Sequence, residues 1–201
     1  MLHPLDVLLW RWAPLQFLNP WYLGRCCLEF FRWLECVVIS RNKSKRAYHA
    51  AVALQADWGF GPEWQAIGTR GKTGCVPIPL AMEVKKSPGL IDVYRVKPEH
   101  QEKFLRGLDE GKKYLLGQIG LPYGYRAVYR LCATMFPVAR RIIPVNRDDD
   151  FEVKEPFCLS LAGSVLRHCG LDLKKKRADC FLLPEHFINS EILEYQFTLV
   201  P

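Results

Sequence analysis

Residues 155–170 do most to decide the fold, and they read Glu-Pro-Phe-Cys-Leu-Ser-Leu-Ala-Gly-Ser-Val-Leu-Arg-His-Cys-Gly. Proline is favoured in the first turn of a helix and glycine directly after the last, so Pro156 and Gly170 predict a helix that ends at Cys169. Cys158 lies in its first turn, where unpaired N–H groups and the helix dipole favour a thiolate over a thiol. Cys158 is therefore a candidate nucleophile, and the same N–H groups are available to bind an oxyanion. The alternative is a small buried hydrophobic residue, as most free cysteines are.

The rest of the chain contains both alternating and helical apolar patterns. Short apolar or alternating runs bounded by turn residues predict strands over 48–54, 63–67, 76–80, 90–96 and 193–200. Apolar residues at helical spacing, or a proline followed by acidic residues, predict helices over 23–38, 98–116 and 125–136, with a short helical turn at 184. The sequence therefore predicts one α+β domain.

His49 lies inside the apolar strand 48–54. Burial of an imidazole costs free energy unless its polar atoms find partners. If a cysteine-bearing helix packs on the face to which His49 points, imidazole and thiol come within reach, and His49 is the candidate base. The alternative is a core or edge histidine whose polar atoms are satisfied. His168 is a weaker rival because it follows Cys158 on the same helix, and the remaining histidines are expected at the surface or a terminus: His3, His100 and His186.

A nucleophile–base pair usually has a third group that orients the imidazole. The predicted return strand offers Gln65, whose neutral amide can hold the ring by a hydrogen bond, as asparagine does in papain-like proteases. Asp57 and Glu63 are alternatives nearer the predicted turn, where solvation is expected.

Five short motifs occur along the chain in an order that resembles one protein family. They are Tyr-His-Ala-Ala-Val at 48–52, Trp-Gln-Ala at 64–66, Gly-Leu-Pro-Tyr-Gly at 120–124, the segment from Phe-Cys to Gly at 157–170, and Leu-Pro-Glu-His-Phe-Ile-Asn-Ser at 183–190. This order is similar to that of the circularly permuted papain-like cysteine amidohydrolases of the NlpC superfamily. In that arrangement the histidine precedes the cysteine.

The resemblance implies an antiparallel half-barrel sheet packed on a cysteine-bearing helix, over residues 36–201. Residues 1–35 have no counterpart and are expected to form an aromatic-rich helical extension. The implied activity is hydrolysis of an amide bond by Cys158, His49 and Gln65, with Tyr48 and Tyr123 as substrate-binding residues. Neither a metal nor an organic cofactor is implied.

Several positions depart from the family pattern. Leu159 and Ser160 replace the usual serine and glutamate, Gln65 replaces a common glutamate, and Gly124 replaces an aspartate. An amide in place of a carboxylate keeps hydrogen bonding but loses the charge that stabilises an imidazolium. The departures therefore favour a second hypothesis, a binding module that retains the fold without the chemistry.

The substrate of an active enzyme stays open at this stage. A peptidoglycan-type peptide fits the resemblance, with a peptide or acyl-amide as the partner. A lipid acyl hydrolase or acyltransferase on the same pair is the alternative, motivated by an apolar start with tryptophan at positions 10, 12, 21 and 33. Charged residues and prolines interrupt this start, so it does not predict a membrane-spanning helix.

Composition limits the remaining function classes. The chain has 201 residues and a formal net charge of +7, with basic clusters at 41–46, 140–141 and 174–177. These clusters could contact a membrane surface or an anionic polymer, or could lie in solvated loops; no aromatic-rich motif predicts nucleic acid binding. The eight cysteines are expected to be reduced, because a chain of this size needs no disulfides and no signal peptide opens it. A cytoplasmic location is therefore predicted, with a phage-associated or membrane-peripheral one left open.

Overall fold

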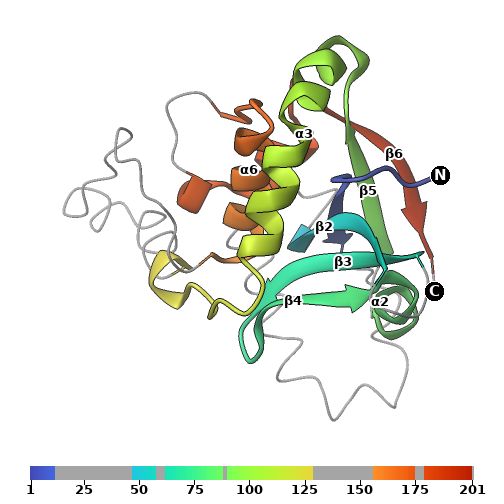
Figure 1. The fold of residues 1–201 in the computed structure, drawn as a ribbon. Coiled ribbons are helices and arrows are strands. Elements are labelled where there is room, and N and C mark those ends of the chain that lie inside the picture. Colours follow the sequence, from blue (N-terminus) through green and yellow to red (C-terminus); the bar gives the residue numbers. More distant parts are fainter. Residues whose placement is uncertain (12–46, 58–61, 88–89, 129–155, 175–178, 201) are drawn as a thin grey trace.

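The computed structural model describes residues 1–11, 47–57, 62–87, 90–128, 156–174 and 179–200. These residues form an α+β structure with one six-stranded antiparallel sheet (Figure 1). The strand order is β4-β3-β2-β1-β5-β6. In chain order the strands are β1 (Val7–Arg11), β2 (Ala47–Asp57), β3 (Pro62–Arg70), β4 (Gly74–Pro79), β5 (Leu90–Val96) and β6 (Leu193–Leu199).

Helices lie on both sides of this sheet. The longest are α3 (Pro98–Gly117) and α6 (Cys158–His168), which lie side by side against one face (Figure 1). The short helix α7 (Pro184–Ile188) contacts β2 and β6, and the 3-10 turn η3 (Asp179–Phe181) packs on α6. Helix α2 (Leu80–Lys86) follows β4 and adds Leu80 to the core of the opposite face.

The sheet separates two hydrophobic cores because successive side chains of a strand point to opposite faces. Val7 and Leu9 of β1 belong to the core that also contains Cys158 and the apolar residues of α6. Leu8 and Trp10 belong to the other core. We call these the α6 core and the α2 core. A strand buried on both faces has apolar residues without alternation, and Val7 to Trp10 have that pattern.

The strand predictions over 48–54, 63–67, 76–80, 90–96 and 193–200 are confirmed within one to three residues at each end. The helices expected at 98–116, 156–169 and 184 are confirmed as α3, α6 and α7. Residues 125–128 are helical, whereas the rest of the helix expected over 125–136 lies outside the described residues, as does the helix expected over 23–38.

The expected helical extension over residues 1–35 is wrong for its described part. Residues Val7–Arg11 form β1, which pairs with β2 on one side and β5 on the other, so it is a central strand. Leu8 and Trp10 are 0% and 3% exposed. The boundary expected at residue 36 therefore does not hold, because the sheet is continuous only if residues from the start of the chain belong to it. Among the described residues no helix is long and apolar enough to cross a membrane.

Candidate active site

Cys158 is the first residue of α6, as the sequence predicted. The first residues of a helix have no intrahelical acceptor for their N–H groups, so Cys158, Leu159 and Ser160 offer donors at this end. Ser160 Oγ accepts a hydrogen bond from the Phe157 N–H at 2.9 Å and donates one to the Phe157 carbonyl, also at 2.9 Å. This departure from the family pattern therefore has a structural role, because it fixes the backbone entering the helix.

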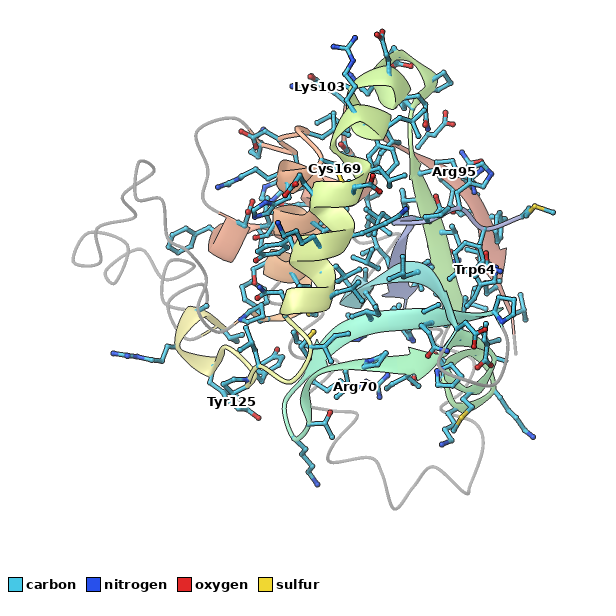
Figure 2. All side chains as sticks on the ribbon, in the orientation of Figure 1. Trp64, Arg70, Arg95, Lys103, Tyr125 and Cys169 are labelled. Carbon is cyan, nitrogen blue, oxygen red and sulfur yellow. The ribbon has the colours of Figure 1, made fainter. Side chains whose placement is uncertain are left out.

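A loop after α3 holds the beginning of α6 against the sheet. The Gly124 N–H donates to the Pro156 carbonyl at 3.1 Å, and the Cys75 N–H of β4 donates to the Leu121 carbonyl at 2.9 Å. Tyr125 extends the attachment, because its hydroxyl donates to the Gly71 carbonyl at 2.8 Å in the turn between β3 and β4 (Figure 2). The expected substrate-binding residue Tyr123 lies in this loop, half-buried, with its ring 4.8 Å from that of Tyr125.

The opposite end of α6 lies at the other end of β2. Cys169 directly follows α6 and lies against Gly111 of α3, whose Cβ position is also close to Leu5. The Leu5 N–H donates to the Ala53 carbonyl of β2 at 2.7 Å. Because α6 packs along β2, its first residue, Cys158, lies toward the end of β2 that begins at Ala47. His49 is at this same end.

His49 and Cys158 are nevertheless associated with opposite faces of the sheet. His49 pairs with Trp10 across β1 and β2, and the two rings meet edge-on with centroids 4.9 Å apart. Trp10 belongs to the α2 core, whereas the next residue of β2, Ala50, belongs to the α6 core with Cys158. The expectation that the cysteine-bearing helix packs on the face to which His49 points is therefore not met in this arrangement.

Gln65 lies on the face of the α6 core, opposite to the face of His49. It pairs with Leu54, whose side chain belongs to the α6 core, and it is 4% exposed. Its Nε2 donates to Glu63 Oε2 at 3.3 Å. Residues 49 and 54 of one strand point to opposite faces because their separation is odd. The alternative Asp57 is exposed at the end of β2, and the side chain of Tyr48, also in β2, lies outside the described part of the chain.

The rival histidines occupy other parts of the molecule. His168 is the last residue of α6, and its ring stacks on Tyr114 of α3 with centroids 4.1 Å apart. His186 lies in α7, where its Nδ1 accepts the Leu183 N–H at 2.8 Å. His168 is therefore at the opposite end of α6 from Cys158.

One buried polar group that the sequence did not single out is Asp179. Its carboxylate accepts from Ser164 Oγ at 2.8 Å and from Arg167 Nη2 at 2.9 Å, both on α6. Burial raises the pKa of Asp179, while the hydrogen bond from Ser164 and the charge of Arg167 oppose the shift. This carboxylate ties η3 to the cysteine-bearing helix. Nothing local in the sequence identifies it, because Ser164 and Asp179 are fifteen residues apart.

A second polar group lies on β1, β5 and β6. Arg11 donates from Nε and Nη2 to Asp92 at 2.9 and 3.2 Å, and Asp92 is 3% exposed. A charged residue between Ile91 and Val93 was the available signal, because buried charges are usually paired.

Two other described cysteines differ from Cys158 in their position. Cys75 is on β4 and Cys169 follows the last residue of α6, so neither lies at the start of a helix. Burial raises the pKa of each thiol to about 11. Neither is a candidate nucleophile at neutral pH, since the thiolate is the reactive form. Among the described residues, no three or more histidine, cysteine, aspartate or glutamate side chains gather as a metal site would require.

Comparison with known proteins adds no assignment. No family model matches the chain, and no curated protein matches it.

Proposed function

We propose that this chain is a thiol hydrolase that cleaves an amide bond with Cys158 as the nucleophile. The observation that carries the proposal is the position of Cys158 as the first residue of an 11-residue helix, on the side that packs into the α6 core. A peptidoglycan-type peptide is the substrate class that the resemblance to permuted NlpC-type amidohydrolases suggests. The antiparallel sheet with α6 against one face is compatible with the papain-like arrangement of that family.

The proposed reaction has two stages. The Cys158 thiolate attacks the amide carbonyl, and the tetrahedral oxyanion accepts hydrogen bonds from N–H groups at the start of α6. The amine leaves with a proton supplied by the base, and a thioester remains. Water, deprotonated by the same base, then attacks the thioester, which releases the acid and regenerates the cysteine.

His49 is the base in this proposal, with Gln65 as its orienting residue. His49 lies at the end of β2 toward Cys158, whereas Gln65 pairs with Leu54 toward the other end of β2, and the register directs the two side chains to opposite faces of the sheet. The proposal therefore requires a rearrangement at the start of β2, where the pairing with β1 shifts register between Trp10 and Arg11. A slip of one residue reverses the face of every side chain in the slipped segment.

A second candidate function is a binding module that keeps the fold without catalysis. The edge-on contact of His49 with Trp10 favours it, because Trp10 belongs to the α2 core and Cys158 to the α6 core on the other face of the sheet. The lipid hydrolase hypothesis was based partly on the tryptophans near the start of the chain. Trp10 does not support it, because its side chain is 3% exposed and packs in the α2 core.

The pH dependence of alkylation by iodoacetamide separates these candidates. Rates are measured for each cysteine by mass spectrometry in the parent, in His49→Ala and in the matched control His168→Ala. A catalytic pair predicts that Cys158 reacts with an apparent pKa well below the free value of about 8.5, and that only His49→Ala removes this advantage. A Cys158 that titrates as a free thiol in all three proteins would reject the hydrolase in favour of the binding module.

A further inference from the structure

A polar cluster lies on the same sheet face as Cys158. The sequence motifs did not identify it, and it has no role in the proposed reaction. Its members are Arg11 of β1, Asp92 and Tyr94 of β5, and Tyr195 and Thr198 of β6. The pairings Val7–Tyr94, Leu9–Asp92 and Asp92–Thr198 put these side chains on the face of the α6 core, because directly paired residues share a face.

The hydrogen bonds of the cluster converge on one carboxylate. Asp92 accepts two from Arg11 and a third from Thr198 Oγ1 at 2.6 Å. Since Thr198 has a single hydroxyl proton and gives it to Asp92, Tyr195 must donate in the 2.8 Å contact between Tyr195 Oη and Thr198 Oγ1. The chain of donors thus runs from Tyr195 through Thr198 to Asp92 and fixes the plane of the Arg11 guanidinium.

Among the described residues, some hydrogen-bond donors of this cluster remain unused. A guanidinium has five N–H donors, and Arg11 gives two of them to Asp92. Tyr94 is 2% exposed, yet within the described structure its hydroxyl has no hydrogen-bond partner. A buried hydroxyl without a partner costs free energy of about 1–3 kcal/mol. The Asp92 carboxylate accepts three hydrogen bonds, and none of them comes from Tyr94.

We propose that Arg11 and Tyr94 form a subsite that binds a carbonyl oxygen of a peptide-like substrate, beyond the bond that Cys158 attacks. The unused N–H groups of Arg11 can only donate, so the ligand atom that meets them must be an acceptor, and the Tyr94 hydroxyl can donate to the same atom. The Arg11–Asp92 pair carries no net charge, so a neutral amide carbonyl fits it better than a carboxylate, which would face Asp92 uncompensated. This inference rests on the proposed function and names part of its substrate.

Arg11 lies at the end of the sheet that also carries Cys158, whereas Tyr94 lies four residues further along β5 than Leu90, the residue that pairs with Arg11. Arg11 pairs with Ala47, and Ala47 and Cys158 are both in the α6 core. The cluster opens to solvent on one side, since the Arg11 side chain is 27% exposed and Tyr195 is 46% exposed. The Tyr195 ring lies edge-on to that of Tyr94, with centroids 5.9 Å apart.

The test uses alkylating probes directed at Cys158. Iodoacetamide carries no second carbonyl, whereas iodoacetyl-glycine amides with one to three glycines carry carbonyls at increasing distance, and iodoacetyl-glycine acids end in a carboxylate. In each reaction the thiolate forms a bond to carbon and iodide leaves. Second-order rate constants for Cys158 are divided by those for glutathione with the same probe, which removes intrinsic reactivity.

Tyr94→Phe is the informative variant because it removes only the unpartnered hydroxyl. We expect at least one glycine amide to react faster with Cys158 than iodoacetamide does, and Tyr94→Phe to lower that advantage about 3- to 10-fold, the worth of one hydrogen bond. The rate with iodoacetamide should not change. Tyr195→Phe is the matched control, since its hydroxyl donates to Thr198 and a smaller loss is expected.

Two results overturn the inference. One is that, for every probe length, the rate of the glycine amide relative to iodoacetamide is the same in the parent and in Tyr94→Phe. The other is a greater advantage for the acids than for the amides, which would make the site a carboxylate site. Failure of the proposed function is recognised separately, by a Cys158 that reacts with iodoacetamide no faster than glutathione does at any pH.

Discussion

Alanine in place of Gly111 should destabilise this protein, although the same change in an exposed helix stabilises. Alanine is favoured over glycine within a helix by about 1 kcal/mol. In the structure, however, a Cβ at Gly111 would lie 2.2 Å from Cys169 Sγ and 3.1 Å from Leu5 Cδ1. The first separation is roughly 1 Å short of the 3.4 Å at which ordinary contact begins. Overpacking of this kind costs about 1–3 kcal/mol, and a 2.2 Å separation calls for the upper part of that range, so after the gain of about 1 kcal/mol we expect a net loss of up to about 2 kcal/mol.

Two other glycines of α3 provide matched comparisons. At Gly107 the new Cβ would lie 2.6 Å from backbone atoms of Cys169, which cannot rotate away, so the loss should be larger, about 3 kcal/mol. At Gly117 nothing lies within 4 Å, so alanine should stabilise by about 0.5–1 kcal/mol. Combining Gly111→Ala with Cys169→Ala removes the sulfur and should recover part of the loss, whereas the same combination with Gly107→Ala should not.

Urea denaturation followed by circular dichroism measures these differences. The ordering tests how closely α6 approaches α3, and hence the placement of the helix that begins with Cys158. If Gly111→Ala stabilises the protein as much as Gly117→Ala does, the close approach of the two helices is refuted.

Two further predictions concern the sheet. Leu8→Ala should lower the free energy of unfolding by about 2–5 kcal/mol, because Leu8 is fully buried in a central strand. The control Met82→Ala, at a 44% exposed position, should change the free energy of unfolding by less than about 0.5 kcal/mol. Equal effects of the two substitutions in urea denaturation would contradict the central position of β1 in the sheet. The pKa of Cys75 is raised from 9.0 to about 11, so the unfolded chain loses this proton first and stability should fall as pH rises from 9 to 11. Cys75→Ala should flatten that decline, and an unchanged slope in thermal denaturation at several pH values would argue against a buried Cys75.

The polar clusters share a property that bears on function. Asp179 and Asp92 are both buried, and each accepts hydrogen bonds from an arginine and from a hydroxyl. Asp179 connects α6 to η3, which gives it a structural role. Asp92 connects only strands that already pair through their backbones, so its network is not needed to hold β1, β5 and β6 together. That difference is why the Arg11 cluster, and not the Asp179 cluster, suggests a ligand.

Local sequence patterns determined the elements that most constrain the site. Pro156 and Gly170 delimited α6 and placed Cys158 in its first turn, because proline and glycine act on the backbone within a few residues. The apolar runs likewise gave the positions of β2, β3, β5 and β6. Each of these conclusions depends on residues that are neighbours in the chain.

The tertiary structure alone decided which residues meet. Val7–Arg11 became a central strand because it pairs with β2 and β5, segments some forty and eighty residues away. An extension had been expected instead, because residues 1–35 have no counterpart in the pattern that the chain resembles. Strand alternation predicts that His49 and Gln65 each point to one face, but not which face packs on α6. A shift of one residue in register exchanges the two faces, and register is set by long-range pairing and by helix packing. The cysteine could therefore be placed from sequence, whereas its partners could not.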